Sequence, residues 1–172
     1  MNDFLEILKY ILPSLVVFAA AYYLIKLFLD NEQKKKASDI KMEGYKIITP
    51  IRLQAYERLV LFLERISPES LVMRIHKPEL TGLQMQTMLI LAIREEFEHN
   101  LSQQVYISSQ AWEMIKSSKE NMVKLINTAA ANLSDKASGT DLSQKIFELS
   151  LSDKLLVRSA LEFLKNEIRL VF

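Results

Sequence analysis

The chain of 172 residues has 22 lysines and arginines against 21 aspartates and glutamates, and it contains no cysteine. The absence of cysteine excludes disulfides and thiol chemistry, and the balanced charge provides no basic face for a nucleic acid. An apolar stretch and its basic flank occupy residues 1–36, so residues 51–172 have the size of one ordinary domain.

The longest apolar stretch runs from Tyr10 to Leu29 and carries one charge, Lys26, near its end. About 20 helical residues cross a hydrocarbon core of about 30 Å, so we predict a single transmembrane helix. Two other interpretations stay open. One is a signal peptide cleaved at Ala19–Ala21, which the acidic Asp3 and Glu6 disfavour. The other is the core helix of a soluble protein, but a chain of this size has few residues with which to surround such a helix.

Lysines near the two ends of this stretch predict its orientation. Lys9 precedes it, whereas six lysines lie at its far end or follow it: Lys26, Lys34, Lys35, Lys36, Lys41 and Lys46. We therefore expect the N-terminus outside and the C-terminal domain in the cytoplasm. The cluster Lys34–Lys36 is also expected to attract anionic lipid at the membrane surface.

Beyond the anchor, the pattern predicts a tether over residues 37–50 and then an all-α domain of about five helices over residues 51–172. Helices are expected at 51–66, 68–76, 82–104, 110–133 and 141–149, with a last one starting at 152–153. Candidate N-caps are Ser67, with Pro68 at the first helical position, Thr81, Ser108 or Ser109, and Thr140 or Asp141. Residues 105–107 are expected to form a short extended joint.

Apolar residues at helical spacing predict an antiparallel bundle. The helix at 82–104 is expected to form the buried centre through Met88–Ile93. The other core faces are predicted to contain Tyr56, Leu59, Val60, Leu63 and Ile66; then Trp112, Ile115, Met122, Ile126, Ala129 and Leu133; and finally Leu155, Leu156, Ala160, Leu161, Phe163, Leu164 and Ile168. The apolar end, Leu170–Phe172, is expected to dock into the bundle or into a partner.

The one pattern typical of metal ligation is Glu96-x-x-His99, which places a carboxylate and an imidazole on one helical face. Di-iron bundles use this unit twice and add two further glutamates. This chain has one copy, and His76 is its only other histidine. A divalent transition metal held by Glu96 and His99 is therefore a secondary hypothesis. The alternatives are a solvated, ion-paired face, or His99 and Asn100 satisfying backbone groups.

Other residues suggest contacts between helices or with a partner. We expect Arg58 or Arg65 to pair with Glu95 or Glu98, and Trp112 to be a core anchor rather than a ligand platform. No glycine-rich phosphate loop, serine–histidine–aspartate set or His-Glu-x-x-His motif is present, so no catalytic or cofactor-binding residue is predicted.

Two stretches carry a resemblance to a known group of proteins: RLQAYERL at residues 52–59, and AIREEFEHNLSQQVYI at residues 92–107, followed by Trp112. The chain resembles an uncharacterised family of small single-span inner-membrane proteins of Bacteroidota-type bacteria, a domain of unknown function. The resemblance implies a bacterial inner membrane and supplies no activity.

Three functions follow as hypotheses. The first is a non-enzymatic scaffold or adaptor, tethered beneath the membrane, that binds itself or a partner protein. The second is a membrane-tethered metal-binding protein or enzyme that uses Glu96 and His99. The third is a lipid-surface protein that acts through Lys34–Lys36.

Overall fold

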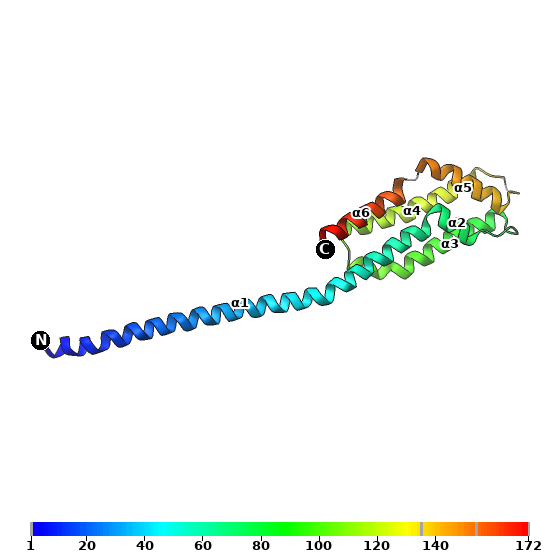
Figure 1. Ribbon diagram of the computed structural model, residues 1–172. Coiled ribbons are helices and arrows are strands. Elements are labelled where there is room, and N and C mark those ends of the chain that lie inside the picture. Colours follow the sequence, from blue (N-terminus) through cyan, green and yellow to red (C-terminus); the bar gives the residue numbers. More distant parts are fainter. Residues whose placement is uncertain (1, 135, 154, 172) are drawn as a thin grey trace. The chain divides into compact units, whose positions relative to one another are not determined.

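The computed structural model describes the backbone of residues 2–134, 136–153 and 155–171, and the side chains of residues 9–134, 136–151 and 157–170. These ranges are all-helical, which confirms the predicted class. The helices are α1 (Asn2–Ile66), α2 (Pro68–Ile75), α3 (Gly82–Asn100), the 3₁₀ segment η1 (Leu101–Val105), α4 (Ser109–Ala131), α5 (Gly139–Asp153) and α6 (Leu155–Val171) (Figure 1). The chain divides into two compact units, Met1–Thr49 and Pro50–Phe172.

Within the described residues, α1 is the one helix long and apolar enough to cross a membrane. Its most apolar window has a mean hydropathy of 1.9, and none of that window is buried in the structure. A core helix of a soluble protein meets the same criteria of length and composition, but its neighbours would cover it. The apolar part of α1 has no such covering.

The predicted tether over residues 37–50 is helical, and the helix expected to begin at residue 51 begins earlier, because α1 is continuous from Asn2 to Ile66. Gly44 and Pro50 suggested a break, since each costs a helix interior stability. Helices flank this segment on both sides, however, and extending an existing helix costs far less than nucleating one. Strong helix formers, including Lys34–Lys36, fill much of the stretch.

Short polar side chains fix the starts of the bundle helices. The Thr81 hydroxyl accepts a hydrogen bond from the Gln84 amide, and the Gln84 side chain accepts one from the Thr81 amide, so α3 begins in a capping box as expected for a threonine cap. Ser108 caps α4 by accepting from the Ala111 amide. Pro68 opens α2 as predicted, but the Ser67 hydroxyl donates to the Glu64 carbonyl instead of capping α2.

The predicted cap of α5 is wrong, because Ser138 fills this role rather than Thr140 or Asp141. The Asp141 amide donates to the Ser138 hydroxyl at 3.2 Å, while the Asp141 carboxylate accepts from both the amide and the hydroxyl of Ser138 at 2.8 Å. These hydrogen bonds, the one from the Ser138 amide foremost, lower the pKa of Asp141. The helix therefore starts at Gly139, two residues earlier than the sequence suggested.

Backbone hydrogen bonds join the loop before α3 to the loop before α5. The Gly82 amide donates to the Ala137 carbonyl and the Gly139 amide to the Leu80 carbonyl, both at 2.8 Å, on either side of an isolated Thr81–Ser138 bridge. A Cβ at position 139 would lie 3.0 Å from the Leu80 carbonyl oxygen. Gly139 therefore permits the close approach of the two loops.

The connection between α3 and α4 also differs from the prediction. Helix α3 ends at Asn100 rather than Gln104, and η1 continues the chain to Val105 in place of an extended joint. The Tyr106 amide then donates to the Gln103 carbonyl, which closes a turn. The Arg52 side chain donates to the Tyr106 carbonyl at 3.1 Å and ties this turn to α1.

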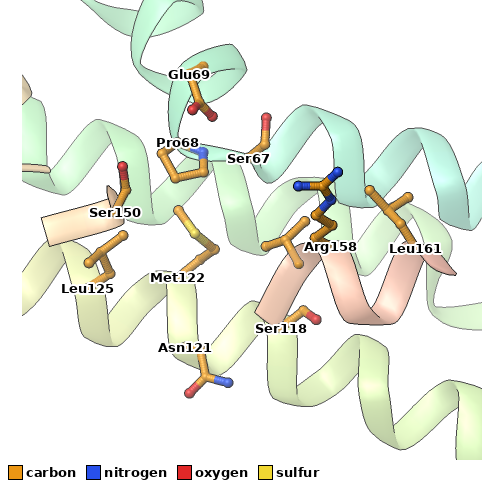
Figure 2. A pocket seen from close by; sticks show the side chains of 11 residues that line it. Ser67, Pro68, Glu69, Ser118, Asn121, Met122, Leu125, Ser150, Arg158 and Leu161 are labelled. Carbon is orange, nitrogen blue, oxygen red and sulfur yellow. The ribbon is translucent and has the colours of Figure 1, made fainter. Parts of the chain in front are cut away.

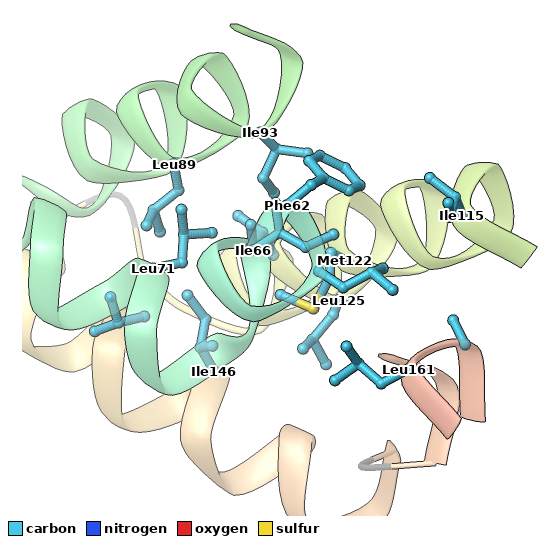
Figure 3. Close-up of a cluster of buried hydrophobic side chains, with 14 of the residues drawn as sticks. Phe62, Ile66, Leu71, Leu89, Ile93, Ile115, Met122, Leu125, Ile146 and Leu161 are labelled. Carbon is cyan, nitrogen blue, oxygen red and sulfur yellow. The ribbon is translucent and has the colours of Figure 1, made fainter. Parts of the chain in front are cut away.

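One apolar core fills the bundle (Figure 3). The predicted face of the α1 end is buried, although Val60 is only partly so, and Phe62 joins it. The predicted seam of α4 is buried as far as Ala129, and Leu133, just beyond the end of the helix, is partly buried. Ser118 is buried next to Lys119, where the apolar repeat is interrupted. On α6, Ala160, Leu161 and Leu164 are buried and Phe163 and Ile168 partly buried. Leu155, Leu156 and the docking of Phe172 lie outside the described side chains.

The prediction that Met88–Ile93 forms the buried centre of the domain is only partly right. Leu89 and Ile93 are fully buried, whereas Met88 and Leu91 are exposed. Helix α3 therefore lies at the surface of the bundle and buries one face. The apolar composition of residues 88–93 therefore predicted more burial than the helix has.

Candidate functional site

A shallow groove between α1 and α3 brings together several residues that the sequence singled out. Its lining comprises Arg58, Leu61, Phe62, Glu96, His99 and Asn100. The predicted residues Glu95 and Glu98 do not line it and are exposed on α3. The groove thus combines one guanidinium, one carboxylate and one imidazole at its edges.

The carboxylate in this groove is already ion-paired. Glu96 Oε1 lies 2.7 Å from Arg65 Nη2 on α1 and 3.5 Å from Arg74 Nη1 on α2, and the Glu96 side chain is 20% exposed. The prediction that Arg65 pairs with Glu95 or Glu98 is therefore wrong. Its partner is Glu96, which lies between these two glutamates on α3. Glu96 follows the buried Ile93 by one turn, so it is the glutamate of this run that faces the neighbouring helices.

This pairing bears on the metal hypothesis for Glu96 and His99. A cation would have to displace two guanidinium groups from Glu96, and His99 is an exposed side chain. Among the described residues, no group of three histidine, cysteine, aspartate or glutamate side chains lies close enough to hold a metal ion. The Asn100 side chain donates to the Glu96 carbonyl at 2.8 Å, as the backbone-satisfying alternative expects for Asn100.

Trp112 lies in the core, in agreement with its prediction as an anchor. Its ring stacks on Phe97 with centroids 5.3 Å apart, and Phe97 contacts Phe62 at 5.9 Å. Lys119 Nζ lies 4.3 Å from the Phe97 ring centroid, a cation–π contact that covers this aromatic group from solvent. Lys119, which interrupts the apolar repeat of α4, therefore contributes to the packing through this contact.

A polar network that the sequence did not reveal connects α1, α4 and α6. The Tyr56 hydroxyl donates to Glu167 Oε1 at 2.8 Å, and the Ser108 hydroxyl donates to Glu167 Oε2 at 3.0 Å. Burial of the phenol, followed by its hydrogen bond to the Glu167 carboxylate, raises the pKa of Tyr56 from 10.0 to about 12. Tyr56 was predicted as an apolar core residue, and sequence spacing offers no signal for a partner 111 residues away.

A cavity of about 250 Å³ opens where the corner between α1 and α2 meets α4, α5 and α6. Apolar side chains of α4 and α6 form its floor, and Ser67, Glu69, Asn121 and Arg158 are among the polar residues that line it (Figure 2). None of these residues was predicted as a site. They come from four separate segments, so no local spacing could have indicated them.

A comparison with known protein families shows which family the chain belongs to. The sequence profile of a family of unknown function, DUF7935, matches residues 2–171. The chain belongs to the DUF7935 family. Neither the curated proteins nor the solved structures include a match to it.

The predicted membrane-surface residues of this DUF7935 protein, Lys34–Lys36, are exposed on α1 one turn beyond Leu29. Two of the hollows in the described part of this DUF7935 chain differ in character. The α1–α3 groove has a paired carboxylate, whereas the cavity around Arg158 has an apolar floor with a cationic edge.

Proposed function

We propose that this DUF7935 protein is a single-pass scaffold or adaptor of a bacterial inner membrane. Residues 10–29 of α1 would cross the bilayer, with the N-terminus outside, and the helical domain would lie in the cytoplasm. The uncovered apolar window of α1 and the excess of lysines after it support this placement. The resemblance to proteins of Bacteroidota-type bacteria supports the choice of membrane.

The observation that carries the adaptor role is the exposed apolar surface of α1 beyond the membrane-length stretch. Five large apolar side chains between residues 38 and 49 are 51–70% exposed: Ile40, Met42, Tyr45, Ile47 and Ile48. Ala37, Ile40, Gly44 and Ile47 follow one another at spacings of three, four and three residues. This spacing lays a stripe along one face of the helix, and we call these four residues the α1 stripe.

The flanking parts of α1 hold residues 37–49 in the helical conformation, but the exposed apolar side chains of this segment gain no stability from burial. Isoleucine and glycine are poorer helix formers than alanine, and Pro50 follows directly. A second helix packed on the α1 stripe would bury the isoleucines and stabilise the segment. Gly44 and Ala37 would allow its backbone to come close.

The partner helix would be another copy of this chain or a helix of a different protein. Two copies anchored in one membrane are parallel and hold their stripes at the same height. The shared anchor raises their effective concentration, so a weak stripe contact suffices for association.

The absence of cysteine makes a direct test possible. Single cysteines placed in the full-length protein at Ile40, Gly44 and Ile47, and for comparison at Asp39 and Lys46, are treated with a short thiol cross-linker in native membranes. We expect cross-linked products at the stripe positions and few at the two polar positions. Equal, low yields at all five positions, together with a purely monomeric detergent extract, would refute the proposal.

The lysine cluster supports a secondary contribution to membrane attachment. We expect replacement of Lys34–Lys36 by glutamine to weaken binding of the full-length protein to anionic over neutral lipid, since each lysine near the surface contributes about 1 kcal/mol. The readout is the fraction of anionic lipid retained around the purified protein. If the preference for anionic lipid stays unchanged, Lys34–Lys36 do not contribute to membrane attachment.

A further inference from the structure

The cavity at the α1–α2 corner has the features of a small-molecule site. Its volume of about 250 Å³ exceeds the cavity of about 150 Å³ that holds benzene in an engineered protein. It is smaller than the range of about 300 to 1,000 Å³ typical of sites for drug-sized ligands. A ligand of roughly ten non-hydrogen atoms therefore fits it.

The floor of the cavity is apolar. Met122 and Leu125 project from α4, and Val157 and Leu161 line it from α6 (Figure 2). All four are buried or partly buried. A ligand that fills this part should be a hydrocarbon, because a polar body would lose its hydration without gaining hydrogen bonds.

The serine hydroxyls that line the cavity already donate hydrogen bonds to backbone carbonyls. Ser67 donates to the Glu64 carbonyl, Ser118 to the Met114 carbonyl and Ser150 to the Phe147 carbonyl, at 2.8–2.9 Å. The Ser67 and Ser150 hydroxyls therefore offer acceptor oxygens to a ligand rather than donors, whereas Ser118 takes part in a further interaction. A donor for the polar end of a ligand has to come from elsewhere in the lining.

Arg158 supplies that donor. It lines the cavity from α6, is exposed, and makes no hydrogen bond or ion pair with the described part of the chain (Figure 2). Of the described acidic side chains near it, Glu162 pairs with Lys165 at 3.0 Å and also feels the charge of Arg158, and Glu69 takes part in another interaction. An exposed guanidinium that makes no ion pair within 4.0 Å in the described part of the chain, next to an apolar floor, matches a carboxylate on a hydrocarbon chain.

We infer that this cavity binds a monoanionic amphiphile, a short- to medium-chain carboxylate whose head pairs with Arg158 and whose chain lies on Met122, Leu125, Val157 and Leu161. The carboxylate of Glu69, which also lines the cavity, disfavours a head with two negative charges. The site is separate from the α1 stripe, so it stands whether or not the stripe binds another helix.

Octanoate, with about ten non-hydrogen atoms, is the matching probe. Equilibrium dialysis of labelled octanoate is carried out against full-length protein in nanodiscs, with empty nanodiscs as background. Octanol tests the hydrocarbon chain without the charge, and octylammonium tests the opposite charge. We expect saturable binding of one octanoate per chain, weaker binding of octanol, and no saturable binding of octylammonium.

Two variants locate the site. Arg158→Met should weaken octanoate binding at least tenfold and leave octanol binding unchanged, whereas Arg169→Met, an exposed arginine on the same helix, should change neither. Val157→Trp should fill the cavity and abolish binding of both ligands. Because Arg158 is exposed, its replacement leaves the core intact; Trp112 fluorescence verifies the fold of the arginine variants, and resistance to limited proteolysis verifies that of Val157→Trp.

Three results would overturn the inference: octanoate binding no higher than that of empty nanodiscs, octylammonium binding as tight as octanoate, or equal octanoate affinity in the wild type and in Arg158→Met. If limited proteolysis shows Val157→Trp to be misfolded, the comparison of Arg158→Met with Arg169→Met decides.

Discussion

Replacing Tyr56 by phenylalanine tests the polar network that ties α6 to α1. The ring stays buried, and what is lost is the hydroxyl that donates to Glu167 at 2.8 Å. Hydrogen bonds to charged groups contribute about 1.5–3 kcal/mol, and Glu167 keeps its bond from Ser108. We therefore expect Tyr56→Phe to lower the free energy of unfolding of the bundle by about 2 kcal/mol.

The chain offers a convenient probe for this measurement. Trp112 is its one tryptophan and stacks on Phe97 in the core, so its fluorescence reports unfolding of the bundle in urea. The full-length protein is measured in nanodiscs, with Tyr45→Phe as the matched control. Tyr45 is 70% exposed in the first unit, so its replacement should leave the urea midpoint unchanged.

The same substitution predicts a pH dependence. The pKa of Tyr56 rises from 10.0 to about 12 on folding, chiefly through burial and then through Glu167. A raised pKa adds stability that is present below pH 10 and is lost as the pH rises from 10 to 12, here about 2 to 3 kcal/mol. The stability difference between wild type and Tyr56→Phe should therefore shrink over this interval. Equal stabilities at pH 8, or a difference that stays constant up to pH 12, would refute the assignment of this hydrogen bond.

Further predictions use the same fluorescence measurement. Glu96→Ala should destabilise the bundle by about 1–2 kcal/mol, between typical exposed and buried ion pairs, while Glu95→Ala should stay within about 0.5 kcal/mol; equal effects would contradict the assigned helix rotation. Gly139→Ala forces a Cβ to within 3.0 Å of the Leu80 carbonyl oxygen and should cost about 1–3 kcal/mol. Gly44→Ala, with nothing within 4 Å, should leave the Trp112 signal unchanged, and a similar loss in both glycine variants would contradict the loop contact.

The sequence predicted those parts of the fold that local chemistry controls. The helix starts at Pro68 and Thr81 follow from one proline and one capping pair, and the α4 seam follows from spacing alone. The start of α5 was predicted late, because Thr140 and Asp141 can each cap a helix, whereas the structure gives this role to Ser138, which exchanges hydrogen bonds with Asp141.

Features that depend on the packing of distant segments were not predictable. Spacing places Glu95, Glu96 and Glu98 on one helix, but only the neighbouring helices decide that Glu96 receives Arg65. The Tyr56–Glu167 hydrogen bond and the Arg158 cavity join residues that are far apart in the chain. Continuity of α1 through Pro50 was missed for another reason: the flanking helices outweigh the local cost of one proline.

The central claim is that residues 10–29 of α1 lie in a lipid bilayer and hold the helical domain at the membrane. Alkaline carbonate extraction of membranes from cells that express the full-length chain tests it most directly. The account predicts that the intact protein stays in the membrane pellet with known integral membrane proteins. Release of the full-length protein into the carbonate supernatant would contradict it.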